Sequence, residues 1–158
     1  MSRTKNAKDY LLVLQRLVAE GALDQPAPNR RGVEWEGLPD ISQRVQAIFS
    51  VAQQKKKSTD MLFFVMYDIE SNKVRRYVVK YLERKGCMRV QKSIFLANLP
   101  MEKYQDIRND LAEVQAAYDN QDSILIVPIT TDYLRSMKVI GQNLDIDIIT
   151  HTRTTLFF

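Results

Sequence analysis

Apolar positions recur at helical spacing in the first part of the chain. Over residues 6–23 they fall every three or four residues, which predicts an amphipathic helix. Residues 24–40 hold three of the five prolines and two of the five glycines, so they are predicted to form a loop. A second helix is predicted to begin at a cap formed by Asp40 or Ser42. Its apolar face consists of Val45, Ile48, Phe49 and Ala52.

After residue 60 the pattern changes to an alternation of strands and helices. The apolar run "MLFFVMYD" at 61–68 predicts a strand that is covered on at least one face. A helix is then predicted between a cap at Ser71 and a stop at Gly86. Residues 87–100 are too long for one simple strand and their apolar phase shifts by one residue. They are therefore predicted to form either two short strands or one strand with a bulge.

The remaining segments continue this alternation. Pro100 is predicted to open a helix whose apolar residues recur at spacings of three and four. The segment "DSILIVPIT" at 122–130 is predicted to be a buried strand, with Pro128 where the ladder frays or at a sheet edge. Residues 131–140 predict a short helical turn, and "LDIDIIT" and "TTLFF" predict further strand segments.

The order of these elements predicts the fold class. Strand, helix, two strands, helix and strand form the β-α-β-β-α-β order of a ferredoxin-like α+β sandwich. We expect residues 61–158 to form this domain with extra C-terminal strands, and residues 1–60 to form a helical N-terminal extension and linker. Many unrelated functions use this fold, so the fold alone decides no activity.

Charge is distributed unevenly along the predicted domain. The chain carries a formal net charge of only +4, but residues 73–92 hold eight Lys or Arg against a single acid, Glu83. Residues 102–122 hold six acids against two basic residues. One surface of the domain should therefore attract a polyanion, and another should repel it.

Several classes of protein are excluded by composition. The single cysteine, Cys87, allows no disulfide within the chain and no multi-cysteine zinc site. The single histidine, His151, allows neither a histidine-based metal triad nor a serine, histidine and acid set. No apolar run approaches the roughly 20 residues that span a bilayer, and the N-terminus lacks a signal-peptide pattern. We expect a cytoplasmic protein with no membrane partner.

Asp68 is a single carboxylate at the end of the first predicted strand, directly before a basic helix. A hydrolytic site usually needs paired carboxylates or a richer set of metal ligands. A catalytic site at this position would therefore need groups from elsewhere. The alternative is that Asp68 accepts hydrogen bonds from the turn before the helix.

Three stretches in this order resemble the CRISPR-associated adaptation proteins of the Cas-two family. They read "MYDIESNKVRRYVVKYLERKG", "RVQKSIF" and "DSILIVPI", and the resemblance covers roughly residues 61–130. It implies a ferredoxin-like homodimer at the centre of an integrase complex that inserts spacers into CRISPR arrays. Typical members begin at the strand predicted at Met61, so residues 1–58 have no counterpart in them.

The resemblance also implies roles for particular residues. Asp68 matches a family aspartate that in many members faces its symmetry mate and has been proposed to hold a divalent metal for phosphodiester cleavage. A two-fold axis would turn one carboxylate into two, which suits Mg²⁺. Ser93 and Phe95 match family positions too, and we expect Phe95 in the core or the dimer interface and Ser93 near the metal. The candidates for binding DNA phosphates are Lys73, Arg75, Arg76, Lys80, Arg89 and Lys92.

Two functions remain open at this level. The first is a non-catalytic dimer that holds double-stranded prespacer DNA and bridges copies of the Cas-one integrase. The second is a Mg²⁺-dependent endonuclease that acts on DNA or RNA, with a variant in which the protein is a toxin ribonuclease resembling virulence-associated protein D. The polarised charge and the C-terminal strands, which suit addition to a partner's sheet, favour the scaffold.

Overall fold

The computed structural model describes residues 38–54, 57–118, 120–141 and 144–147, together with four positions near the N-terminus. Those four positions, all helical, are Leu12, Gln15, Arg16 and Ala19. They fall inside the helix predicted over residues 6–23. Most of the predicted loop at 24–40 and the whole "TTLFF" segment lie outside the described residues.

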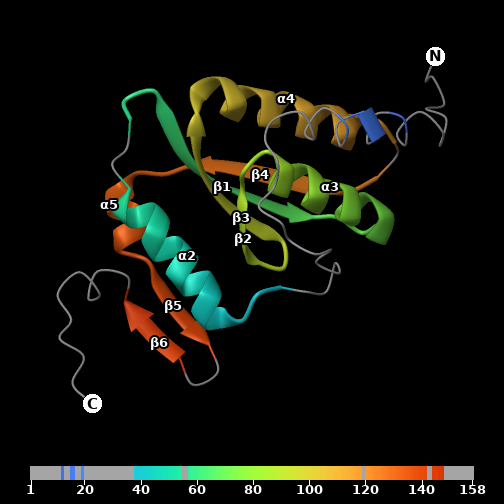
Figure 1. Cartoon of the computed structure of the whole chain (residues 1–158). Helices are drawn as coiled ribbons and strands as arrows, with labels where there is room; N and C mark the ends of the chain where they lie inside the picture. Colours follow the sequence, from blue (N-terminus) through green and yellow to red (C-terminus); the bar gives the residue numbers. More distant parts are fainter. Residues whose placement is uncertain are drawn as a thin grey trace, which may run out of the picture.

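A four-stranded antiparallel sheet forms the centre of the domain (Figure 1). Its strands run in the order β2-β3-β1-β4, and two helices cover one face. This is the ferredoxin-like α+β architecture that the sequence predicted. The sheet elements are β1 Asp60–Asp68, β2 Met88–Gln91, β3 Ile94–Pro100 and β4 Ser123–Pro128. The two covering helices are α3 Asn72–Arg84 and α4 Met101–Ala116.

Local signals set the limits of α3. The Ser71 side chain accepts a hydrogen bond from the Val74 N–H and so caps the N-terminus of the helix. Gly86 follows the last turn with a φ of 95°, in the left-handed region that glycine adopts without a steric penalty. The Cys87 N–H then donates to the Leu82 carbonyl at 2.9 Å, so the chain turns directly into β2.

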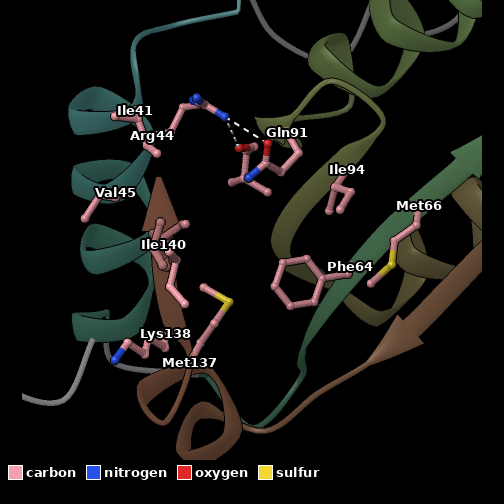
Figure 2. A pocket seen from close by; sticks show the side chains of 13 residues that line it. Ile41, Arg44, Val45, Phe64, Met66, Gln91, Ile94, Met137, Lys138 and Ile140 are labelled. Carbon is pink, nitrogen blue, oxygen red and sulfur yellow. Dashed lines mark hydrogen bonds between the residues drawn. The ribbon is translucent and has the colours of Figure 1, made fainter. Parts of the chain in front are cut away.

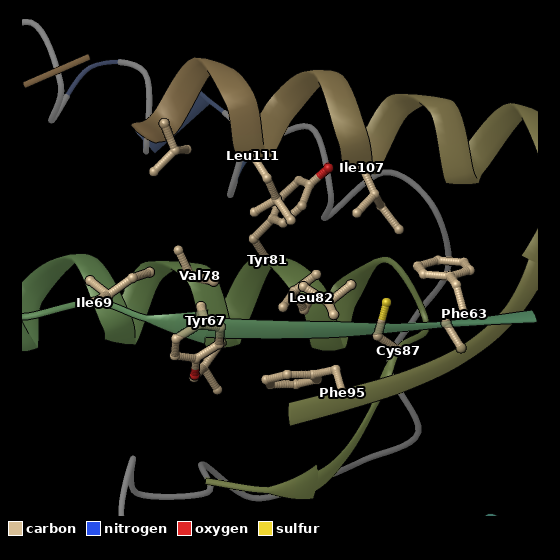
Figure 3. Packing of buried hydrophobic residues seen from close by; sticks show 14 of the residues in the cluster. Phe63, Tyr67, Ile69, Val78, Tyr81, Leu82, Cys87, Phe95, Ile107 and Leu111 are labelled. Atoms are coloured by element: carbon tan, nitrogen blue, oxygen red, sulfur yellow. The ribbon is translucent and has the colours of Figure 1, made fainter. Parts of the chain in front are cut away.

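The main core lies between the sheet and these two helices (Figure 3). Alternate residues of β1, namely Phe63, Val65 and Tyr67, point toward the helices because successive strand side chains face opposite sides. Phe95 of β3 lies in the same layer and is completely buried. The helices contribute Val74, Val78, Tyr81, Leu82, Ile107 and Leu111.

The second face of the sheet is covered mainly by the N-terminal extension. Helix α2, Ile41–Gln53, begins at the cap Asp40, whose side chain accepts from the Gln43 N–H at 2.9 Å. Its apolar residues form a second core with the opposite side of β1 and with β2 and β3. The short helix α5, Thr131–Arg135, adds Leu134 to this core. The buried α2 side chains are Val45, Ile48, Val51 and Ala52, while Phe49 is half-buried.

Residues 87–100 combine both arrangements that the sequence left open. They form two strands, and the register between β2 and β3 also shifts between Arg89 and Gln91. The change of apolar phase has a different origin, because β3 is covered on both faces. Met88, Val90, Ile94 and Leu96 face the second core, while Phe95, Ala97 and Leu99 face the main core.

Two sequence predictions were wrong in detail. β4 is not a buried strand, because among the described residues it pairs only with β1 and no helix or strand covers its second face. Leu125 and Val127 are accordingly 59% and 37% exposed. The predicted placement of Pro128 at a sheet edge is confirmed.

The helical turn predicted over residues 131–140 is shorter than expected. Helix α5 ends at Arg135, and β5, Lys138–Gly141, pairs instead with β6, Leu144–Asp147, in a separate two-stranded antiparallel sheet. Pairing in this hairpin, together with packing of Val139 against the second core, favours the extended conformation. No helix in the described part of the chain combines the length and the apolar character that crossing a bilayer requires.

Candidate nucleic-acid interface and carboxylate site

Asp68 is the last residue of β1 and is exposed. Strand alternation places it on the second face of the sheet, on the same side as Phe64 and Met66. Its partner across the ladder is Ser123, the first residue of the edge strand β4. The carboxylate therefore stands at a corner of the sheet, open to an approaching molecule.

The turn after Asp68 is held by another acid. One carboxylate oxygen of Asp122 accepts a hydrogen bond from the Glu70 N–H at 3.0 Å, and the other accepts from the Tyr118 hydroxyl. Asp122 thus ties the exit of β1 to the loop that enters β4. In the described ranges no hydrogen bond to the carboxylate of Asp68 is found, and the turn is held by Asp122.

One chain supplies few ligands for a metal ion at this corner. Among the residues that the structure describes, no three His, Cys, Asp or Glu side chains lie close enough to hold a metal together. Mg²⁺ is held by one or two carboxylates plus waters and phosphate oxygens. For Asp68 to serve as one such ligand, a second carboxylate would have to come from outside the described residues.

Helix α3 displays a stripe of positive charge. Lys73, Arg76 and Lys80 recur at spacings of three and four, and all three are exposed. Arg75 is half-buried, and its guanidinium donates to the side-chain oxygen of Asn72 at the start of the helix. Three of the six predicted phosphate ligands therefore lie on one face of a single rigid helix.

Two other predicted ligands, Arg89 and Lys92, meet at the turn between β2 and β3. Arg89 donates from Nε and Nη2 to the backbone carbonyl of Lys92, at 3.1 and 2.7 Å. The Tyr67 N–H donates to the carbonyl of Ser93 at 3.0 Å, which sets the turn beside the end of β1. Ser93 therefore lies next to the strand end that carries Asp68.

Tyr67 links the helix and the turn, and the sequence analysis did not single it out. Its hydroxyl donates to the Lys92 carbonyl at 3.3 Å. Burial raises the pKa of Tyr67, and the nearby positive charges of Arg89 and Arg75 partly oppose this effect. The two arginines, which come from different elements, are thus close enough to act on the same phenol. Its position immediately before Asp68 was the only sequence signal for it.

The negative surface lies beside the positive one rather than on the opposite side of the molecule. Helix α4 packs next to α3 on the same face of the sheet (Figure 1) and exposes Glu102, Asp106 and Glu113. Glu113 forms an ion pair with Arg16 of the N-terminal extension at 2.6 Å. A polyanion that binds α3 would therefore be repelled by α4 along one border.

Comparison with known proteins gives one family. Residues 61–137 match the model of the family described as CRISPR associated protein Cas2. The matched segment runs from the second residue of β1 to the residue before β5, and so includes α3, β2, β3, α4, β4 and α5. It excludes α2 and the β5–β6 hairpin. No curated protein matches the chain.

Proposed function

Through residues 61–137 the chain belongs to the CRISPR associated protein Cas2 family, and on that premise we propose that it is a scaffold for spacer acquisition. In this proposal a homodimer holds double-stranded prespacer DNA in the cytoplasm and bridges copies of the Cas-one integrase. The observation that carries it is the exposed basic face of α3, together with the approach of Arg75 of α3 and Arg89 of β2 to the same tyrosine, Tyr67.

The arrangement suits phosphate binding better than base reading. Lys73, Arg76 and Lys80 project from a capped helix, so their charges have fixed spacing without a flexible loop. Contacts of this kind supply sequence-independent affinity and release counterions from the duplex. A scaffold that accepts spacers of any sequence requires this type of binding.

A two-fold dimer would duplicate the basic surface. Two α3 helices would present twice the number of phosphate ligands along a longer stretch of duplex. Within the described residues the β5–β6 hairpin pairs with no further strand, so its edges offer backbone groups to which a partner's strand could add. Both features favour a protein that assembles with partners around DNA.

Reconstituted integration tests the scaffold directly. A labelled duplex, the integrase and this chain are combined with an array substrate, and integrated product is measured. Product should depend on the chain and should fall strongly when Lys73, Arg76 and Lys80 are replaced together by Ala. Integration that proceeds equally well without the chain would contradict the scaffold.

Asp68 supports a second candidate, a Mg²⁺-dependent endonuclease acting on DNA or RNA. The exposed carboxylate has no hydrogen bond within the described residues, so it is available as a ligand. Two copies of Asp68 across a two-fold axis would hold the ion, which when bound supplies an activated water for phosphodiester hydrolysis. The chain's own contribution would be to position the substrate phosphate with Arg75 and Lys92.

A further inference from the structure

The second face of the sheet is only partly covered by the part of the chain that the structure describes. Helix α2 packs over β2 and β3, and leaves the β4 side open. Phe64 pairs with Val127, and Met66 pairs with Leu125, so all four side chains lie on this face. The two β4 residues are exposed, although both are large and apolar.

The cover that α2 provides is also imperfectly packed. A partly open cavity of about 310 Å³ lies between α2, β5 and the sheet (Figure 2). Ile48 of α2, Phe64 of β1 and Val139 of β5 line it, and Ile140 borders it while remaining 73% exposed. Most of the exposed lining of this opening is apolar, so a partner that covers it would remove apolar surface from water.

The outer surface of α2 differs from that of the other long helices. Its only charged residue, Arg44, turns back to the sheet and donates from Nη1 to Val90 O at 3.1 Å and to Gln91 Oε1 at 3.0 Å (Figure 2). The exposed side chains are all uncharged, although 27% of the whole chain is charged. They are Ser42, Gln43, Gln46, Ser50 and Gln53. Depletion of charge is typical of the centre of a protein interface and is unsuited to DNA phosphates.

We propose that the outer face of α2, together with Leu125 and Val127 on the open β4 side of the same sheet face, forms part of the contact between two copies of this chain. The inference rests on the proposed homodimer and adds a surface that the family match, residues 61–137, does not include. The N-terminal extension would therefore be an assembly element of the dimer.

A second copy fits this face better than an unrelated protein does. A two-fold interface places residues near its axis against their own copies, where any charge would meet the same charge. Glutamine avoids that conflict because its amide both donates and accepts, so it can pair with itself. Asp68 lies on the same face, and contact through this face would bring the two Asp68 carboxylates to one side of the dimer.

Charge placement on α2 tests the contact in the full chain. Gln46 and Ser50 lie one turn apart and are exposed, so Gln46→Glu with Ser50→Glu should preserve the monomer fold. Sedimentation equilibrium should show a dimer dissociation constant at least tenfold higher for this variant. The matched control is Gln105→Glu with Ala112→Glu on the exposed side of α4, which should dimerise as the wild type does.

Mixing opposite variants separates contact from indirect effects. A chain with Gln46→Lys and Ser50→Lys should also dimerise weakly alone, but an equimolar mixture with the Glu variant should recover heterodimers. Weak dimers without recovery on mixing, or variants that dimerise normally, would overturn the α2 contact and leave the homodimer standing. A wild-type chain that is monomeric throughout the concentration range would overturn both.

Discussion

Tyr67 and Arg89 donate hydrogen bonds to the same acceptor, the backbone carbonyl of Lys92, from 3.3 and 2.7 Å. The shared acceptor joins the end of β1 to the β2–β3 turn. The two hydrogen bonds fix the backbone position from which the Lys92 side chain extends. They also hold that position close to Asp68, because Tyr67 directly precedes Asp68 in β1.

Removing the Tyr67 hydroxyl should loosen this turn without disturbing the aromatic core. Tyr67→Phe keeps the ring beside Phe95, at a centroid distance of 6.3 Å, and loses one hydrogen bond. We expect a loss of about 1 kcal/mol in unfolding free energy and weaker duplex binding, measured by chemical denaturation and fluorescence anisotropy. Tyr77→Phe, on the half-buried side of α3, is the matched control. Equal duplex affinity in both variants would show that the β2–β3 turn does not contribute to DNA binding.

Duplex binding should be sensitive to salt and insensitive to sequence. Each phosphate contact contributes roughly 0.9 to the slope of log affinity against log salt concentration. Replacing Lys73, Arg76 and Lys80 together by Ala should therefore lower the magnitude of the slope by about 3 per chain, as measured by anisotropy titrations over a range of salt. Arg108→Ala, an exposed change on α4, should leave the slope unchanged. An unaltered slope in the triple variant would show that α3 does not contact the DNA phosphates.

Asp68→Asn separates the scaffold from the nuclease. The change keeps the shape of the side chain and removes the charge from both copies in a dimer. If the carboxylates share Mg²⁺, cleavage should fall by at least about a hundredfold while duplex affinity is retained. Integration with the integrase should remain nearly intact if the protein is a scaffold, and its loss together with cleavage would contradict that function. Cleavage and integration are measured on the same preparation.

Cys87 should be unreactive in the folded protein. Burial raises the pKa of its thiol from 9.0 to about 12, so at pH 8 only about one molecule in 10,000 carries the thiolate. Labelling by a thiol reagent at pH 8 should therefore require unfolding. Labelling rates that match the unfolding rate, measured by mass spectrometry, would agree with this expectation. Fast labelling in native buffer would not.

The same pKa shift predicts the direction of a pH effect on stability. A thiol whose pKa is higher in the folded state contributes fully below the unfolded pKa of about 9, and its contribution is lost as the pH rises toward 12. The unfolding free energy should decline over that range. Cys87→Ala should make the decline shallower, and denaturation curves at several pH values measure it.

Local physics made the main elements of the fold predictable. The Ser71 cap, the left-handed Gly86 and the continuous apolar run of β1 depend on residues close together in the chain, so their consequences are visible in the sequence. The length of residues 87–100 likewise indicated more than one simple strand. Asp68 was found because it is a single carboxylate at the end of an apolar run. The basic side chains were found because Lys and Arg are concentrated in residues 73–92.

Tertiary pairing decided what the sequence left open. The exposure of Leu125 and Val127 depends on β4 having one neighbour and on α2 covering only the far side of the sheet, and neither fact is local. The link between Tyr67, Arg89 and the Lys92 carbonyl requires β1 and the β2–β3 turn to be adjacent, although 25 residues separate Tyr67 from Lys92. Periodicity predicts which side of a strand or helix is apolar. It does not determine which element covers that side, because that choice depends on contacts between residues far apart in the chain.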